Sequence, residues 1–128
     1  MLLLDTDILI NILRSYQPAI EWISSVEDII SITDFTAMEL IQGCENKTEL
    51  HKVQNTIEKF SILWLSTEGC NIALKAFIKL RLSHNIGLLD VIIAQIAIEN
   101  NLQLHTFNIK HYKPIKNLVT SQPYQKDC

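Results

Sequence analysis

The sequence predicts an α/β fold in three layers, α/β/α, with a mostly parallel sheet of four or five strands. Short apolar or β-branched runs alternate along the chain with longer segments whose apolar residues recur at helical spacing. Such alternation is typical of a parallel sheet covered by helices on both faces. The chain has 128 residues, of which 48% are hydrophobic and 20% charged. This length and composition indicate one globular domain over residues 1–128.

Strands are expected where apolar or β-branched residues form short runs. The expected strands are residues 1–4, 29–33, 62–65 and 103–106, with 115–119 as an added edge strand. A parallel strand buried on both faces carries a continuous apolar run, and the run Leu2-Leu3-Leu4 fits this pattern. The final residues, 120–128, are expected to form a loose tail.

Helices are expected between the strands because apolar residues recur there every three or four positions. The expected helices are residues 6–13, 18–26, 34–44, 50–60, 70–82 and 88–100. Pro18 is placed to begin the second of them, since proline is favoured in the first turn of a helix. The segment 88–100 is apolar on nearly every side, so we expect it to lie buried between other elements.

Charge and cysteine content exclude several classes of protein. The formal net charge is −3, so the chain has no global basic surface and any contact with nucleic acid must be local or assisted by a metal ion. Cys44, Cys70 and Cys128 are odd in number and far apart, which favours neither a disulfide framework nor a zinc site and fits a reducing cytoplasm. Asp5 and Asp7 interrupt the apolar N-terminus, and no later run is long enough to cross a membrane, so we expect a soluble protein.

Acidic residues follow the predicted strands in a pattern that indicates a metal site. Ligands of parallel α/β sheets bind outside the carboxyl ends of the strands, and Asp5 stands at the end of the first strand. Glu39 lies on the helix after the second strand, and Asp90 begins the buried helix before the fourth. Clustered carboxylates repel one another unless a cation binds, and oxygen ligands select Mg²⁺ or Mn²⁺. Such an ion polarises a phosphodiester and activates water, so the implied chemistry is hydrolysis at phosphorus.

Each acid also has a purely structural interpretation. Asp5 and Asp90 are both placed to cap the helices that they begin. Thr36 and Glu39 have the spacing of a capping box, in which the hydroxyl and the carboxylate each accept a backbone N–H. On local sequence alone capping is the stronger interpretation of Glu39, and the pattern of the whole chain favours the metal ligand.

Two further polar residues leave alternatives open. Asp7 fits either a support for the metal ligands or a second cap on the same helix. Asn108 fits either an Asx-turn that closes the fourth strand or a contact to the metal through water.

Four segments of the chain resemble the successive motifs of PIN domains. They are LLLDTDILI (2–10), TAMELIQG (36–43), GLLDVIIAQIAIENNLQLHT (87–106) and FNIKHY (107–112). Because they occur in the family's order and near its spacing, the resemblance covers essentially the whole chain. The branch that it resembles most is the VapC-type toxin ribonucleases of type II toxin–antitoxin systems.

The resemblance implies roles for individual residues. The positions that match the family's acids are Asp5, Glu39 and Asp90, with Asn108 where a fourth acid is frequent, and those that match its supporting hydroxyl groups are Thr6 and Thr106. An amide at position 108 carries no charge, so the resemblance leaves open whether a second metal ion binds. The family implies a metal-dependent endoribonuclease that forms a homodimer and is held inactive by an antitoxin protein.

Basic and apolar surfaces suggest further contacts. Arg14, Lys110 and Lys113 are either ordinary solvated side chains or groups that steer the phosphates of RNA. The helices at residues 18–26 and 50–60 offer more apolar surface than so small a domain easily covers, which also favours a homodimer.

Two competing functions follow from the same residues. Asp5-Thr6-Asp7 after the first strand imitates the nucleophile motif of haloacid-dehalogenase phosphatases, in which the first acid attacks phosphorus and the second transfers protons. That chemistry also needs a downstream lysine and paired acids after a later strand, where this chain has Thr106-Phe107-Asn108. The second alternative is a PIN-like scaffold that has lost its chemistry and only binds partners.

Overall fold

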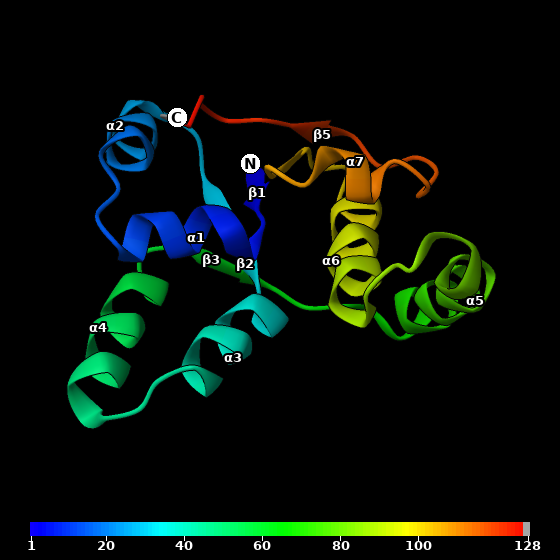
Figure 1. The fold of residues 1–128 in the computed structure, drawn as a ribbon, viewed down its shortest axis with the longest axis horizontal. Coiled ribbons are helices and arrows are strands. Elements are labelled where there is room, and N and C mark those ends of the chain that lie inside the picture. The colour runs from blue at the N-terminus through cyan, green and yellow to red at the C-terminus, as the bar shows by residue number, and fades with distance from the viewer. Residues whose placement is uncertain (127–128) are drawn as a thin grey trace.

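The computed structural model describes residues 1–126, in which one parallel sheet lies between layers of helices (Figure 1). The strands are β1 (Leu2–Leu4), β2 (Ile30–Thr33), β3 (Ser61–Leu63), β4 (Leu104–His105) and β5 (Thr120–Ser121). Their order is β3-β2-β1-β4-β5, and every pairing is parallel. Because β1 pairs with β2 on one side and with β4 on the other, the direction of winding reverses at β1. The residues after β1 therefore stand where parallel sheets bind ligands.

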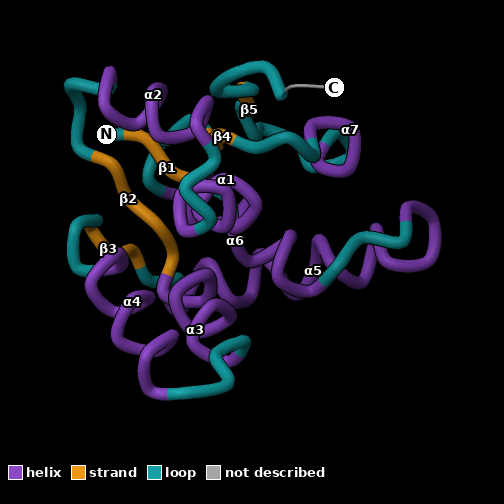
Figure 2. The backbone as a smooth tube through the Cα atoms, turned by 60° about the vertical axis from the view of Figure 1, so that its left-hand side comes forward, coloured by secondary structure: helices purple, strands orange, loops and turns teal. Residues whose placement is uncertain are grey.

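Figure 1 shows the helices in two groups around this sheet, and Figure 2 shows the strands following one another in the order β3, β2, β1, β4 and β5. The helices are α1 (Thr6–Leu13), α2 (Gln17–Ser25), α3 (Asp34–Gln42), α4 (Lys47–Ile57), α5 (Thr67–His84), α6 (Leu88–Glu99) and α7 (Ile109–Tyr112). The first four helices lie together at one end of Figure 1, and α5 and α6 lie together at the other. The predicted three-layer fold with a parallel sheet is confirmed.

Alternation along the strands divides the core between the two faces of the sheet. Leu3 of β1 packs with α6 in one buried cluster, whereas the next residue, Leu4, packs with Ile8 and Leu9 of α1 in the other. Helix α6 supplies most of the first cluster, and α5 packs against α6 from outside. The nearly all-apolar sequence of α6 is thus explained by its position between the sheet and α5.

Helix α3 begins at Asp34 as expected, but its cap is not the one that a capping box of Thr36 and Glu39 requires. Its cap is Thr33, the last residue of β2, whose Oγ1 accepts the backbone N–H of Thr36 at 3.0 Å. Thr36 therefore lies inside the first turn, and Glu39 lies a full turn further along the helix. The capping-box alternative for Thr36 and Glu39 is wrong, because the extended residue that ends the strand already supplies the capping hydroxyl.

The end of the chain also differs from the prediction. Residues 115–119 form no strand, since Asn117 takes a left-handed backbone conformation with φ of 69° and turns the chain there. The edge strand is instead β5, which pairs with β4. Tyr124 beyond it contacts Trp22 and Phe107 through ring packing. The expected loose tail is therefore wrong for residues 120–126, and the rest of that tail, 127–128, lies outside the described residues.

Exposed apolar side chains lie on a helix other than the two expected. Trp22 and Ile57, from the two helices singled out by the sequence, pack against the cluster around α1. The most exposed apolar side chains on α5 are Leu74, Ile78 and Leu82, with 57%, 70% and 97% of their surface open. Among residues 1–126, no helix combines the length and the apolar character needed to cross a membrane.

Candidate acidic active site

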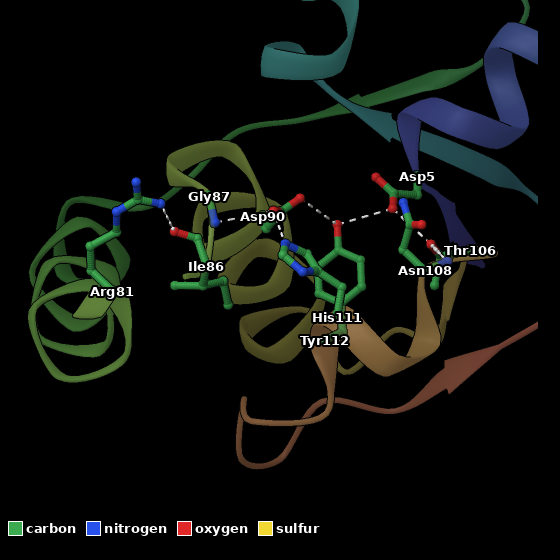
Figure 3. A network of polar contacts seen from close by, with 9 residues as sticks. All are labelled: Asp5, Arg81, Ile86, Gly87, Asp90, Thr106, Asn108, His111 and Tyr112. Carbon is green, nitrogen blue, oxygen red and sulfur yellow. Dashed lines mark hydrogen bonds and ion pairs between the residues drawn. The ribbon is translucent and has the colours of Figure 1, made fainter. Parts of the chain in front are cut away.

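Two carboxylates from distant parts of the sequence meet at one tyrosine hydroxyl. Asp5 follows β1 directly, and Asp90 lies in the first turn of α6. The hydroxyl of Tyr112, on α7, lies 3.0 Å from Oδ2 of Asp5 and 3.4 Å from Oδ1 of Asp90 (Figure 3). The structure therefore places these two acids on the same side of the molecule, at the carboxyl end of β1.

Asp5 is held by both of its oxygens. Oδ1 accepts the backbone N–H of Thr6 at 2.8 Å, so Asp5 does serve as the cap of α1. Oδ2 accepts the hydroxyl of Thr106 at 2.8 Å. The residue is only 5% exposed, and this burial, followed by the charge of Asp7, raises the pKa of Asp5 from 3.8 to about 6. The hydrogen bonds to Asp5 lower its pKa and offset part of that rise.

Asp90 is held by a glycine and a histidine. Its Oδ2 accepts the backbone N–H of Gly87 at 3.3 Å and lies 2.7 Å from Nε2 of His111. A Cβ at position 87 would lie 2.7 Å from that oxygen, closer than such contacts occur. Glycine at position 87 therefore leaves room for the carboxylate. Asp90 caps α6 as the sequence suggested, and its Oδ1 still faces Tyr112 and Asp5.

Asp7 belongs to the scaffold of the site. Its two oxygens accept the backbone N–H groups of Ile8 at 2.8 Å and of Phe107 at 2.9 Å. The second of these bonds ties the start of α1 to the loop after β4. Since both oxygens are engaged by backbone groups, Asp7 is poorly placed to transfer protons as the phosphatase interpretation requires. Burial raises the pKa of Asp7 as well.

Glu39 lies in a neighbouring groove. The hydroxyls of Thr6 and Thr36 are 3.1 Å apart, which joins the start of α1 to the start of α3. Glu39 follows one turn later, is exposed, and lines a groove of about 650 Å³ together with Thr6 and Arg14. Within residues 1–126 no three acidic, histidine or cysteine side chains stand close enough to form a complete metal cage. The structure thus brings Asp5 and Asp90 together and places Glu39 in a groove that is lined by Thr6, the residue after Asp5.

Thr106 and Asn108 form the turn after β4. The hydroxyl of Thr106 accepts the backbone N–H of Asn108 at 3.0 Å and also donates to Asp5. Asn108 is exposed and gives α7 no side-chain cap. The turn is therefore made by the threonine, and the Asx-turn expected at Asn108 is wrong.

The three basic side chains proposed to contact RNA are exposed and lie on or at the end of α1 and α7. Arg14 ends α1 and lines the groove that holds Glu39. Lys110 and Lys113 are exposed, the first on α7 and the second at its end. Among residues 1–126 neither Asp5 nor Asp90 forms a salt bridge with a lysine or an arginine.

Sequence reasoning missed Tyr112 and His111. Both fall in the segment FNIKHY, but an aromatic residue in an apolar pattern predicts core, and the chain's four histidines have no close metal-ligand spacing. The ring of Tyr112 is indeed core, at 1% exposure, packed with Leu3 and Leu104. Only its hydroxyl reaches the acids. A tyrosine rather than a phenylalanine at a buried position was the available signal, because a buried hydroxyl needs a partner.

The fold and the acidic site define a family. The model of the PIN domain matches residues 2–116, and the chain belongs to that family. At the level of single relatives, the chain is 31% identical over 121 residues to Ribonuclease VapC10 of Mycobacterium tuberculosis, which covers 92% of this chain and 90% of the relative.

Solved structures agree with the fold. A VapBC-1 structure from nontypeable Haemophilus influenzae superposes with a TM-score of 0.78 at 27% identity, over 93% of this chain and 95% of that one. A DNA-bound VapBC from Salmonella typhimurium gives a TM-score of 0.82 at 24% identity, over 94% and 98%. A toxin-antitoxin complex from Klebsiella pneumoniae gives 0.78 at 24% identity, over 98% and 100%.

Proposed function

We propose that this chain is the ribonuclease of a toxin–antitoxin pair and that it hydrolyses RNA phosphodiester bonds with a divalent cation. The observation that carries the proposal is the meeting of Asp5 and Asp90 at the carboxyl end of β1, at the point where the sheet reverses. The name of the relative in Mycobacterium tuberculosis and the toxin–antitoxin titles of the structural neighbours support the activity and its regulation.

The donor set fits a hard cation. Asp5 and Asp90 offer only oxygen, which is the chemistry that Mg²⁺ and Mn²⁺ prefer. Asp5 is buried with its pKa raised, so its ionised form lacks a compensating positive charge. A divalent ion would supply that charge, so we propose Asp5 and Asp90 as its ligands. We propose that Glu39, which lines a groove together with Thr6, contributes through water.

The residues of the chain would then orient the two carboxylates and contact the phosphates of the RNA. A bound divalent cation polarises the phosphodiester and activates water. Thr6 and Thr106 fix the orientation of the Asp5 carboxylate, and Gly87 and His111 fix that of Asp90. We propose that Arg14, Lys110 and Lys113 receive phosphates of the RNA strand, since all three are exposed and belong to α1 and α7, the helices that follow Asp5 and carry Tyr112. Asn108 would act through water rather than as a charged ligand.

The partners are part of the same proposal. The similar structure from Klebsiella pneumoniae is a toxin-antitoxin complex, and we propose that an antitoxin protein likewise restrains this chain. We also propose that the chain forms a homodimer and works in the cytoplasm. The cation is Mg²⁺ or Mn²⁺ in this scheme.

The test uses the purified protein and a set of RNA oligonucleotides. Cleavage should need Mg²⁺ or Mn²⁺, stop with a chelator, and fall by orders of magnitude in Asp5→Asn and Asp90→Asn. The matched control is Asp28→Asn, which makes the same chemical change at an exposed acid that contacts the N-terminus. Cleavage that survives both Asp5→Asn and Asp90→Asn would exclude these acids as the centre of the reaction, and no cleavage by the wild type would favour a scaffold that only binds partners.

A further inference from the structure

The ring of Tyr112 fixes the position of its hydroxyl. The side chain is 1% exposed and packs among residues of β1, α6 and β4. A tyrosine ring has two rotatable bonds, and tight packing removes the freedom of both. The hydroxyl therefore stands at a defined point at the edge of the core, where Asp5 and Asp90 approach it (Figure 3).

The hydroxyl acts toward these acids as a hydrogen-bond donor. A tyrosine phenol ordinarily has a pKa of about 10, so it carries its proton at neutral pH. Ionised carboxylates only accept, and the phenol has a single proton, so it donates to one carboxylate at a time or shares that proton between the two, with the shorter contact to Asp5. For Oδ1 of Asp90, Tyr112 is the hydrogen-bond donor that the structure shows.

The contact joins three elements that are distant in the sequence. Asp5 ends a strand, Asp90 begins a helix, and Tyr112 comes from a third segment more than twenty residues beyond Asp90. The preceding residue, His111, holds the other oxygen of Asp90. Two consecutive residues of α7 thus fix both oxygens of one acid and one oxygen of the other.

We propose that Tyr112 is a positioning residue that sets the spacing and orientation of Asp5 and Asp90 for the divalent cation. This inference rests on the proposed cation site. Tyr112 would not bind the RNA or the reacting atoms. Its hydroxyl holds the two carboxylates toward one another, and without it the packing of α6 against β1 alone would set their relative position.

The experiment is a titration with Mn²⁺ in the absence of RNA. The electron paramagnetic resonance signal of the free ion measures how much Mn²⁺ is bound. Tyr112→Phe keeps the ring in the core and removes only the hydroxyl, and we expect its Kd for Mn²⁺ to rise about tenfold, as is common when a supporting partner of a metal ligand is lost. The control is Tyr124→Phe, which removes a phenol hydroxyl that contacts Asn11 away from the acids and should leave the Kd unchanged. Cleavage by Tyr112→Phe should show a lower kcat with little change in KM.

The outcomes separate this inference from the proposed function. An unchanged or lower Kd in Tyr112→Phe overturns the positioning role, even if RNA cleavage by the wild type is intact. A wild type that binds no Mn²⁺ overturns it as well. If the Kd rises as expected and the wild type cleaves no RNA, the positioning role holds and the ribonuclease activity is wrong.

Discussion

At the scale of single residues, the buried Asp5 makes the stability of the cation-free protein depend on pH. A folded-state pKa of about 6, against 3.8 ordinarily, means that the native state binds a proton more tightly than the unfolded state between these values. Ionised Asp5 thus destabilises the fold by about 3 kcal/mol above pH 6. That penalty is relieved as the pH falls through 6.

We therefore expect the wild type in chelator to gain more thermal stability than Asp5→Asn between about pH 7.5 and about pH 5.5. Burial also raises the pKa of Asp7 and Asp34 and lowers that of His105, so the comparison with Asp5→Asn isolates the contribution of Asp5. Calorimetry at the two pH values measures it. Equal gains in the two proteins would show that Asp5 carries no penalty.

We also expect added Mg²⁺ to raise the melting temperature of the wild type. A ligand that binds only the folded state raises the melting temperature by mass action. At neutral pH without metal, Asp5→Asn should be at least as stable as the wild type, because the unfavourable charge is gone. It should also lose most of the stabilisation by Mg²⁺. A variant that is destabilised without metal and still fully stabilised by Mg²⁺ would mark Asp5 as structural.

Glu39 permits a cleaner test now that its capping role is excluded. It is exposed and lies beyond the first turn of α3, so Glu39→Gln should leave the free energy of unfolding almost unchanged. If its charge serves the cation, RNA cleavage by the folded variant should fall by orders of magnitude. Kinetics with matched denaturation curves give both quantities. Cleavage at the wild-type rate would remove Glu39 from the proposed site.

The change matched to Glu39→Gln is Thr33→Ala, at the cap of the same helix. It removes the hydroxyl that caps α3 and should lower the free energy of unfolding by roughly 0.5–2 kcal/mol. Cleavage per folded molecule should change far less than in Glu39→Gln. The two variants together separate the stability of α3 from the chemistry of its exposed acid.

The candidate site shows which part of such a centre a sequence can reveal. Asp5 could be predicted as a site residue from the sequence, because the topology of a parallel sheet places the residue after its first strand at the edge where ligands bind. Tyr112 could not be predicted as a site residue. An aromatic residue in an apolar pattern is predicted as core, and that prediction describes the ring but not the hydroxyl. Glu39 matched the pattern of two roles, and only the cap at Thr33 removed one of them.

At the scale of elements, periodicity predicted the long helices and the buried strands and failed at short segments. The bounds of α1 agree with the expected 6–13, because an apolar stripe begins directly after a capping acid. The four-residue α7 has no periodicity to detect, and β5 was displaced from 115–119 by the backbone turn at Asn117. Such short elements depend on pairing with a neighbour, which only the fold provides.

The C-terminal segment offers a prediction at this scale. Tyr124 packs its ring against Phe107 at 5.0 Å and Trp22 at 6.2 Å between ring centroids, and its hydroxyl accepts from Asn11. We expect Tyr124→Ala to lower the free energy of unfolding by about 2 kcal/mol, less than for a fully buried aromatic residue because Tyr124 is only half-buried. Urea denaturation measures the change. A loss near zero would mean that this segment packs only loosely on α2.

At the scale of the whole molecule, charge and apolar surface are distributed unevenly. The net charge of −3 gives no general attraction for RNA, so binding must depend on the few exposed cations near the acids and on the metal ion. The main unexplained surface is on α5, where Leu74, Ile78 and Leu82 recur every four residues and form one exposed apolar stripe. Such a stripe is typical of a helix that packs against another chain.

A second copy of the chain packed on α5 would cover this stripe. If α5 forms the proposed homodimer, the wild type should behave as a dimer in light scattering at micromolar concentration, and Ile78→Glu should shift it to a monomer, because a charge buried in an apolar interface has no partner. Ser83→Glu is the control, since Ser83 is exposed on the same helix but off the stripe, and it should leave the dimer intact. Melting curves establish that both variants are folded. A wild-type monomer would assign the stripe to a different protein, for which the proposed antitoxin is the first candidate, and a dimer that persists in Ile78→Glu would place the interface elsewhere on the molecule.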